Sequence, residues 1–351
     1  MVLLGATICH AQDAPYTLRT GTELVILPTR VTSAGGDTIY GLRADQFVVE
    51  DNGLRQQVRV EPAEAGQGIS LAVVVQCSRS AEDQMETLHD LSAMVNQIAG
   101  AGPHEVAVMI FGDGVKILSG FSKEDAVTEH ALASMTPCRY DFGAVTLDAV
   151  AYANSLLQKQ PQTSRHAILL VSETRDHGSK AHAEEVVAAL GASNTLIYSV
   201  AYSPVRRAVT DYFRGSPEPA KQQPVKPVET DHPGSISSEA HDLTTAIIPK
   251  KPPVLSWPPY ILAAANALRG NASAELAQLS GGEYFSFTDR ASFDNDLQSI
   301  ANHSHNLYQL SYRPSSDVAG TAGLHRITVR VPTYPNAHIN SRTSYWLGEA
   351  K

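Results

Sequence analysis

The chain has 351 residues, and 43% of them are hydrophobic, so it has enough apolar material for a folded core and is not a disordered protein. Its 27 Lys and Arg against 36 Asp and Glu give a net charge of −9, which argues against nucleic acid and anionic membranes as main partners. No apolar run approaches the roughly 18–20 residues of a transmembrane helix, so we expect no membrane-spanning segment.

Residues 1–11 (MVLLGATICHA) are apolar and end in small residues suited to a signal-peptidase site. We interpret them as a signal peptide, which predicts a secreted or periplasmic protein. A positively charged start is missing, so a disordered cytosolic N-terminus stays an alternative. Cleavage after Ala11 removes Cys9 and leaves Cys77 and Cys138, an even number of cysteines that suits an oxidising compartment.

Residues 12–66 form an N-terminal β segment in this interpretation. Short β-rich runs follow one another from Leu24 to Val60, and Asn52-Gly53 lies between two of them. Asn-Gly between β-rich runs is a strong hairpin signal.

Strands and helices alternate through residues 67–203. Ile69 to Val75 is a continuous apolar run, as expected of a parallel strand buried on both faces. We expect Ser80 to cap a helix that continues to Ile98, followed by a hairpin at Asp113-Gly114. The remaining predicted elements are a helix over 144–157, a strand over 167–171, a helix over 183–190 and a strand over 196–201.

Eleven of the 20 prolines lie between Pro204 and Pro259, and we interpret residues 204–259 as a Pro-rich flexible insertion. The α/β pattern resumes over 260–305, and a C-terminal β segment covers 306–351. The predicted fold is therefore a doubly wound, mostly parallel sheet with one antiparallel edge strand, plus a small β-sandwich-like unit built from the two terminal segments.

Ligands of doubly wound sheets bind beyond the carboxyl ends of the strands, so the residues that follow each strand are the candidate site. We call this set the strand-end rim. Its members are Gln76, Ser78, Arg79, Ser80, Arg139, Tyr140, Ala144, Glu173, Arg175 and Asp176. The sequence contains no nucleophile elbow, Walker loop or zinc-protease motif, so we expect no enzyme activity.

Several motifs in the correct order resemble the von Willebrand factor A domain, in the form found in bacterial VWFA-related proteins. They are Glu50-Asp51-Asn52-Gly53, the strand that leads to Ser78 and Ser80, Thr146 to Val150, Leu276 to Phe285, Tyr308 to Pro314, and Ile327 to Val329. The resemblance implies the A-type α/β fold and a metal-ion-dependent adhesion site for Mg²⁺, formed by Asp-x-Ser-x-Ser, a Thr and a distant Asp.

The sequence departs from that metal site at three positions. Gln76 replaces the first Asp, Ala144 falls on the Thr position, and Glu173 replaces the distant Asp. Magnesium requires oxygen ligands and nearby negative charge. We therefore expect no cofactor and a degenerate metal site, with Ser78, Ser80 and Glu173 as the remaining candidate ligands.

In an A-type fold Cys77 and Cys138 lie on two loops of the same rim, so the resemblance makes them a candidate disulfide, with two separately buried thiols as the alternative.

We expect a non-catalytic module that recognises a protein or glycan at the strand-end rim. Two alternatives stay open: a Mg-dependent adhesion domain with a weakened site, and a structural component of a cell-envelope assembly.

Overall fold

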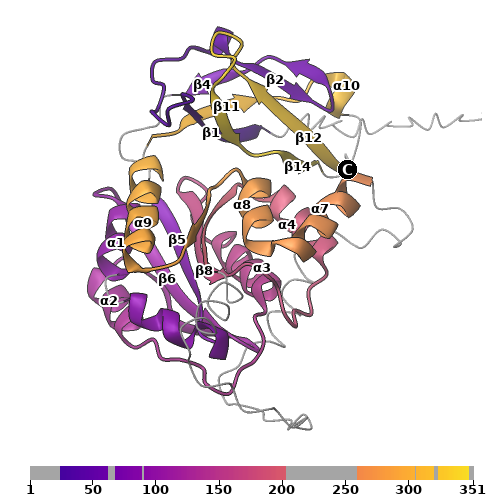
Figure 1. Ribbon diagram of the computed structural model, residues 1–351. Coiled ribbons are helices and arrows are strands. Elements are labelled where there is room, and N and C mark those ends of the chain that lie inside the picture. The colour runs from indigo at the N-terminus through magenta and orange to yellow at the C-terminus, as the bar shows by residue number, and fades with distance from the viewer. Residues whose placement is uncertain are drawn as a thin grey trace, which may run out of the picture.

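The computed structural model describes residues 24–61, 68–88, 91–202, 259–304, 306–319 and 323–347. The predicted signal peptide and nearly all of the predicted Pro-rich insertion lie outside these residues. The described chain forms an α/β unit and a β unit, which lies at the top of Figure 1. No helix among the described residues has the length and apolarity to cross a bilayer.

A six-stranded sheet forms the centre of the α/β unit, with the strand order β10-β9-β8-β5-β6-β7. All neighbouring pairs are parallel except β6 and β7, which form the predicted hairpin. The sheet consists of β5 (Ile69–Gln76), β6 (His104–Phe111), β7 (Val115–Ser122), β8 (Arg165–Glu173), β9 (Thr195–Tyr202) and β10 (Tyr284–Phe287). The predicted fold class, including its single antiparallel edge strand, is confirmed.

Helices cover both faces of this sheet because its central strands are apolar on both sides. In β5, Leu71 and Val73 pack into one core, whereas Ala72 and Val74 pack into the other. The first core is covered by α1 (Leu91–Ala99), α2 (Asp125–Ala133) and α9 (Arg290–Ser304). The second is covered by α3 (Thr146–Leu157), α4 (Ala183–Ala192), α7 (Pro259–Gly270) and α8 (Ala272–Ser280), on the opposite side of the sheet in Figure 1.

One expectation for the α/β unit was wrong, and one helix was not predicted. Ser80 does not cap an α-helix: it lies in the 3₁₀ helix η2 (Arg79–Leu88), and the α-helix begins only at Leu91. The Ser80 hydroxyl instead bonds to Gln76 and Ser78, so it is not available to cap. Helix α2 was not predicted from the sequence because it is short and only weakly amphipathic.

The β unit contains two four-stranded sheets, ordered β13-β1-β11-β4 and β14-β12-β2-β3. Each combines strands from the two ends of the chain, and one apolar core includes residues of both. The strands are β1 (Val25–Thr32), β2 (Val48–Asp51), β3 (Leu54–Gln56), β4 (Arg59–Glu61), β11 (Tyr308–Tyr312), β12 (Gly323–Arg330), β13 (His338–Ser341) and β14 (Ser344–Leu347); η1 (Ala44–Gln46) and α10 (Ser316–Ala319) are short helices between them. The predicted sandwich-like unit is therefore present.

Local sequence explains two features of these sheets. Asn52 and Gly53 have φ values of 49° and 84° and form the tight turn between β2 and β3, as Asn-Gly predicts. Pro28 lies inside β1 opposite Gln309 of β11, but the pairing of β1 with β13 begins only at Thr29. The missing N–H of proline is tolerated because only one side of the strand is paired there.

Arg342 of the β unit joins it to the C-terminus of α4. Its buried guanidinium donates to the carbonyl oxygens of Leu190 (3.0 Å) and Gly191 and to Asn194 Oδ1 (2.8 Å). These carbonyls belong to the last turn of a helix, where intrahelical partners run out and positive charge is favoured. Burial lowers the pKa of Arg342 to about 10, so the side chain stays charged at neutral pH.

A second polar contact at the junction joins β1 to the segment before β10. Arg30 forms an ion pair with the buried Glu283, and His303 Nδ1 lies 2.9 Å from the same carboxylate. Between these contacts, Gly281 has a φ of 79°, and a Cβ there would lie 2.3 Å from the Arg342 backbone nitrogen. The close approach of the two units therefore requires glycine at this position.

Cys77 and Cys138 form a disulfide, as expected, with a sequence separation of 61 residues. Cys77 directly follows β5, and Cys138 lies on the loop before α3. The Cys138 N–H also donates to the Cys77 carbonyl oxygen (2.6 Å). The bond therefore cross-links two loops at the carboxyl end of the sheet.

Replacement of the buried junction arginine, Arg342→Met, is expected to lower the free energy of unfolding by about 3 kcal/mol, because it leaves the α4 carbonyls without their charged donor. Urea unfolding followed by circular dichroism measures the change. The matched control is Arg326→Met, at an exposed arginine of β12, which is expected to stay near the wild type. Equal stability of the two variants would contradict the role of Arg342.

The double variant Cys77→Ser/Cys138→Ser is expected to lose about 3–4 kcal/mol of stability, because the unfolded chain regains the entropy of a long loop. Unfolding curves with and without dithiothreitol measure this. The reductant should bring the wild type down to the variant and leave the variant unchanged. A wild type that is indifferent to the reductant would argue against the cross-link.

Candidate functional site

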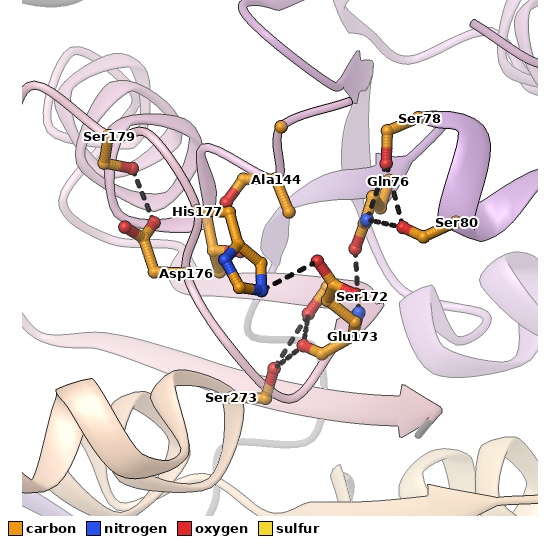
Figure 2. Close-up of polar contacts among 12 residues, drawn as sticks. Gln76, Ser78, Ser80, Ala144, Ser172, Glu173, Asp176, His177, Ser179 and Ser273 are labelled. Carbon is orange, nitrogen blue, oxygen red and sulfur yellow. Dashed lines mark hydrogen bonds and ion pairs between the residues drawn. The ribbon is translucent and has the colours of Figure 1, made fainter. Parts of the chain in front are cut away.

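The side-chain amide of Gln76 is the centre of the strand-end rim (Figure 2). Gln76 is the last residue of β5, and its Nε2 donates to Ser78 Oγ (2.7 Å) and Ser80 Oγ (3.0 Å). Its Oε1 accepts the backbone N–H of Glu173, at the end of the neighbouring strand β8, over 2.8 Å. One amide thus connects both serines of the first loop to the end of the next strand.

The orientation of this amide follows from its partners. The Glu173 backbone N–H can only donate, so the Gln76 atom facing it must be the carbonyl oxygen. The NH₂ group then faces the two hydroxyls, which lie 3.2 Å from each other. Both protons of the NH₂ group therefore have an acceptor, and each serine oxygen has a donor.

These residues do not fit the magnesium site that the resemblance implies. The oxygens of Ser78 and Ser80 converge on an N–H donor, which repels a cation and occupies the space between them. Ala144 is buried and supplies only a methyl group at the threonine position. Thr146, two residues later, directs its hydroxyl to the Ala144 carbonyl oxygen (3.4 Å). The cluster thus lacks two of the oxygen ligands and one of the negative charges that Mg²⁺ requires.

Glu173 retains a carboxylate at the rim but is only 4% exposed. Burial raises the pKa of this carboxyl group, which disfavours its charged form, while the His177 ring, 3.7 Å away, favours it. Its backbone oxygen accepts hydrogen bonds from Ser172 and Ser273, and Ser273 belongs to α8. The last residue of β8 is therefore hydrogen-bonded to β5 through Gln76 and to α8 through Ser273 (Figure 2).

Asp176, predicted as a rim residue, uses its carboxylate inside the protein. Its Oδ1 accepts the Leu147 backbone N–H (2.9 Å) and the Ser179 hydroxyl (2.6 Å). Leu147 lies in the first turn of α3, so the carboxylate acts as a cap there. Burial raises the pKa of Asp176, in keeping with this partly covered position.

The other predicted rim residues lie on exposed parts of neighbouring loops. Arg79 is exposed at the start of η2, and Arg175 is exposed beyond β8. Arg139 forms an ion pair with Glu82 (3.1 Å), and Tyr140 is exposed beside it. The disulfide joins the Gln76 loop to the loop that carries Arg139 and Tyr140.

Three contributors to this region were not predicted from the sequence. Asp113 and Asp148 organise its loops: Asp113 accepts the Gly143 N–H, and Asp148 accepts the Ala181 N–H. Tyr202 ends β9 opposite Glu173, and its buried hydroxyl has no hydrogen-bond partner among the described residues. The position of Tyr202 at the end of a strand could have identified it as a rim residue. Nothing in the sequence pattern identifies the two aspartates, because local sequence does not reveal contacts between loops.

Among the described residues, no group of three or more His, Cys, Asp or Glu side chains is arranged to hold a metal ion. At the rim, the Ser78 and Ser80 hydroxyls bond to Gln76 and to each other. The imidazole of His177 faces Glu173. The rim is thus a self-bonded polar cluster surrounded by exposed basic and aromatic side chains.

No family model matches the sequence, and no curated protein matches it. Solved structures are similar at low identity. The BatB protein from Bacteroides thetaiotaomicron is 13% identical, with a TM-score of 0.38, 67% of this chain covered and 100% of that one. An aerotolerance-related membrane protein from Bacteroides fragilis is 14% identical, with a TM-score of 0.40 and the same two coverages, 67% and 100%.

A third similar structure is proximal thread matrix protein 1 from the mussel byssus, with a zinc-occupied adhesion motif. It is 12% identical, with a TM-score of 0.41, and the match covers 73% of this chain and 50% of that one. The sheet order, the single antiparallel edge strand and the helices on both faces give the α/β unit a doubly wound fold, as the resemblance to the von Willebrand factor A domain implies.

Proposed function

We propose that the chain is a non-catalytic recognition module, secreted or periplasmic, which binds a protein or glycan at its strand-end rim without a bound magnesium ion. The observation that carries the proposal is the Gln76 amide, which donates to both serine hydroxyls where an A-type site would hold its cation. A neutral, hydrogen-bonded cluster gives the rim a fixed shape with no ion to bridge to a ligand.

The basic side chains of the rim support direct recognition. Arg79 and Arg175 are exposed on adjacent loops, and within the described parts of the chain neither has a carboxylate partner. A guanidinium group recognises carboxylates through two parallel hydrogen bonds and needs no metal for this. The exposed arginines are therefore suited to replace the cation in contacting an acidic ligand.

Isothermal titration with MgCl₂ tests the metal-free part of the proposal. The wild type is expected to give no binding heat above that of an EDTA-saturated control. The double variant Gln76→Asp/Ala144→Thr restores a carboxylate and a hydroxyl, and is expected to bind Mg²⁺ at least about tenfold more tightly than the wild type. Saturable Mg²⁺ binding by the wild type would favour the Mg-dependent adhesion domain instead.

Capture from cell-envelope extract tests the recognition part. The immobilised protein is expected to retain a partner equally with MgCl₂ and with EDTA, and to lose it on charge reversal in Arg79→Glu/Arg175→Glu. The matched control, Arg59→Glu/Arg326→Glu, changes two exposed arginines of the β unit and should retain it. If the Arg79→Glu/Arg175→Glu variant still captures the partner, recognition at the rim is refuted. If the protein forms a stoichiometric assembly that neither double variant changes, it is a structural component of the envelope.

A further inference from the structure

Two large aromatic side chains are exposed on the loop that follows Cys138. Tyr140 is 85% exposed, the highest value among the large hydrophobic side chains of the described residues, and Phe142 is 66% exposed, the same as Tyr40. Exposed aromatic side chains lose contact with water when they bind, and they dominate the energy of many recognition surfaces. The Arg139–Gly143 loop therefore presents apolar area that the folded chain does not use in its core.

This loop is held in place by several independent contacts. The disulfide fixes its start, and the Arg79 N–H donates to the Asp141 carbonyl oxygen (2.9 Å). Asp113, on the β6–β7 hairpin, accepts the N–H groups of Phe142 (3.1 Å) and Gly143 (2.5 Å). Binding would thus require little further ordering of the backbone, and this preorganisation strengthens association.

The charged groups next to the aromatic rings differ in the contacts that they already make within the protein. The Arg79 guanidinium carbon lies 5.7 Å from the centre of the Phe142 ring, a cation–π contact that leaves its N–H donors available. The nearby carboxylates already have partners: Asp113 and Asp141 accept backbone N–H groups, and Glu82 pairs with Arg139. The surface therefore combines two exposed aromatic rings with the N–H donors of Arg79, and its carboxylates already hold contacts within the protein.

We propose that Arg79, Tyr140 and Phe142, here named the aromatic platform, bind an acidic segment of a partner protein. The carboxylate of an Asp or Glu would pair with the Arg79 guanidinium, and neighbouring apolar side chains would cover the two rings. This inference rests on the proposed recognition function and specifies its ligand class.

The donor-rich character of the platform favours a peptide over a neutral glycan. Sugar hydroxyls both donate and accept hydrogen bonds, so a glycan site needs acceptors as well as donors. Here the exposed guanidinium of Arg79 only donates, and each of the nearby carboxylates already holds a contact within the protein. An acidic polysaccharide would satisfy the donors, and it is therefore included as a competing ligand in the test.

Selection from a phage-displayed library of random short peptides, on the full chain in EDTA, tests the proposal. The enriched peptides are expected to contain Asp or Glu beside aromatic or aliphatic residues. Fluorescence anisotropy of the most enriched peptide should show binding that is at least about tenfold weaker in Arg79→Glu and in Tyr140→Ser/Phe142→Ser. Matched controls at exposed positions of the β unit, Arg59→Glu and Tyr334→Ser, should bind like the wild type.

Three results would overturn the proposal: enriched peptides without acidic residues, binding that the platform variants leave unchanged, or no enrichment at all. Binding of polygalacturonate alone, lost in the platform variants, would assign the platform to an acidic glycan. Circular dichroism confirms that each variant is folded. If capture from envelope extract depends on Arg175 while the platform variants have no effect, the recognition function stands and only the assigned ligand class is wrong.

Discussion

The hydrogen bonds of one buried amide determine the character of the strand-end rim. Gln76 stands at the end of a strand that is buried along its whole length, so its side chain has little freedom and must bond locally. It bonds to two hydroxyls on its own loop and to the backbone of the adjacent strand. An aspartate at this position would lack the N–H donors, and the two serines would then be free to accept a cation. The Gln76 amide, together with the methyl group of Ala144, thus gives the rim a chemistry that does not suit a cation.

The rest of the molecule keeps that rim fixed. The disulfide joins the Gln76 loop to the loop before α3, and Asp176 attaches the segment after β8 to the first turn of α3. At the other end of the molecule, Arg342 and the Arg30–Glu283 ion pair attach the β unit to the α/β unit. The first and last described segments of the chain combine in the β unit, so the rim is formed by the loops between them. A surface built this way is suited to recognition by shape and charge.

The sequence predicted the architecture because its signals are local and repeated. The apolar run of β5, the Asn52-Gly53 turn and the alternation of strands and helices each follow from backbone and burial preferences. The resemblance to the von Willebrand factor A domain made Cys77 and Cys138 a candidate disulfide, and the structure contains this bond. The helix expected from Ser80 was wrong because a hydroxyl that can cap a helix can also bond to another side chain. The contacts of Asp113 and Asp148 could not be predicted, because they join loops that are distant in sequence.

A crystal structure from crystals soaked in MnCl₂, with anomalous scattering data, tests whether the Gln76 cluster excludes a divalent cation. Manganese occupies magnesium sites, and its anomalous signal locates it without ambiguity. We expect no anomalous peak between Ser78 and Ser80, and electron density for the Gln76 amide within hydrogen-bond distance of both hydroxyls. A manganese peak at about 2.2 Å from the two serine oxygens, with the Gln76 amide displaced, would contradict this expectation.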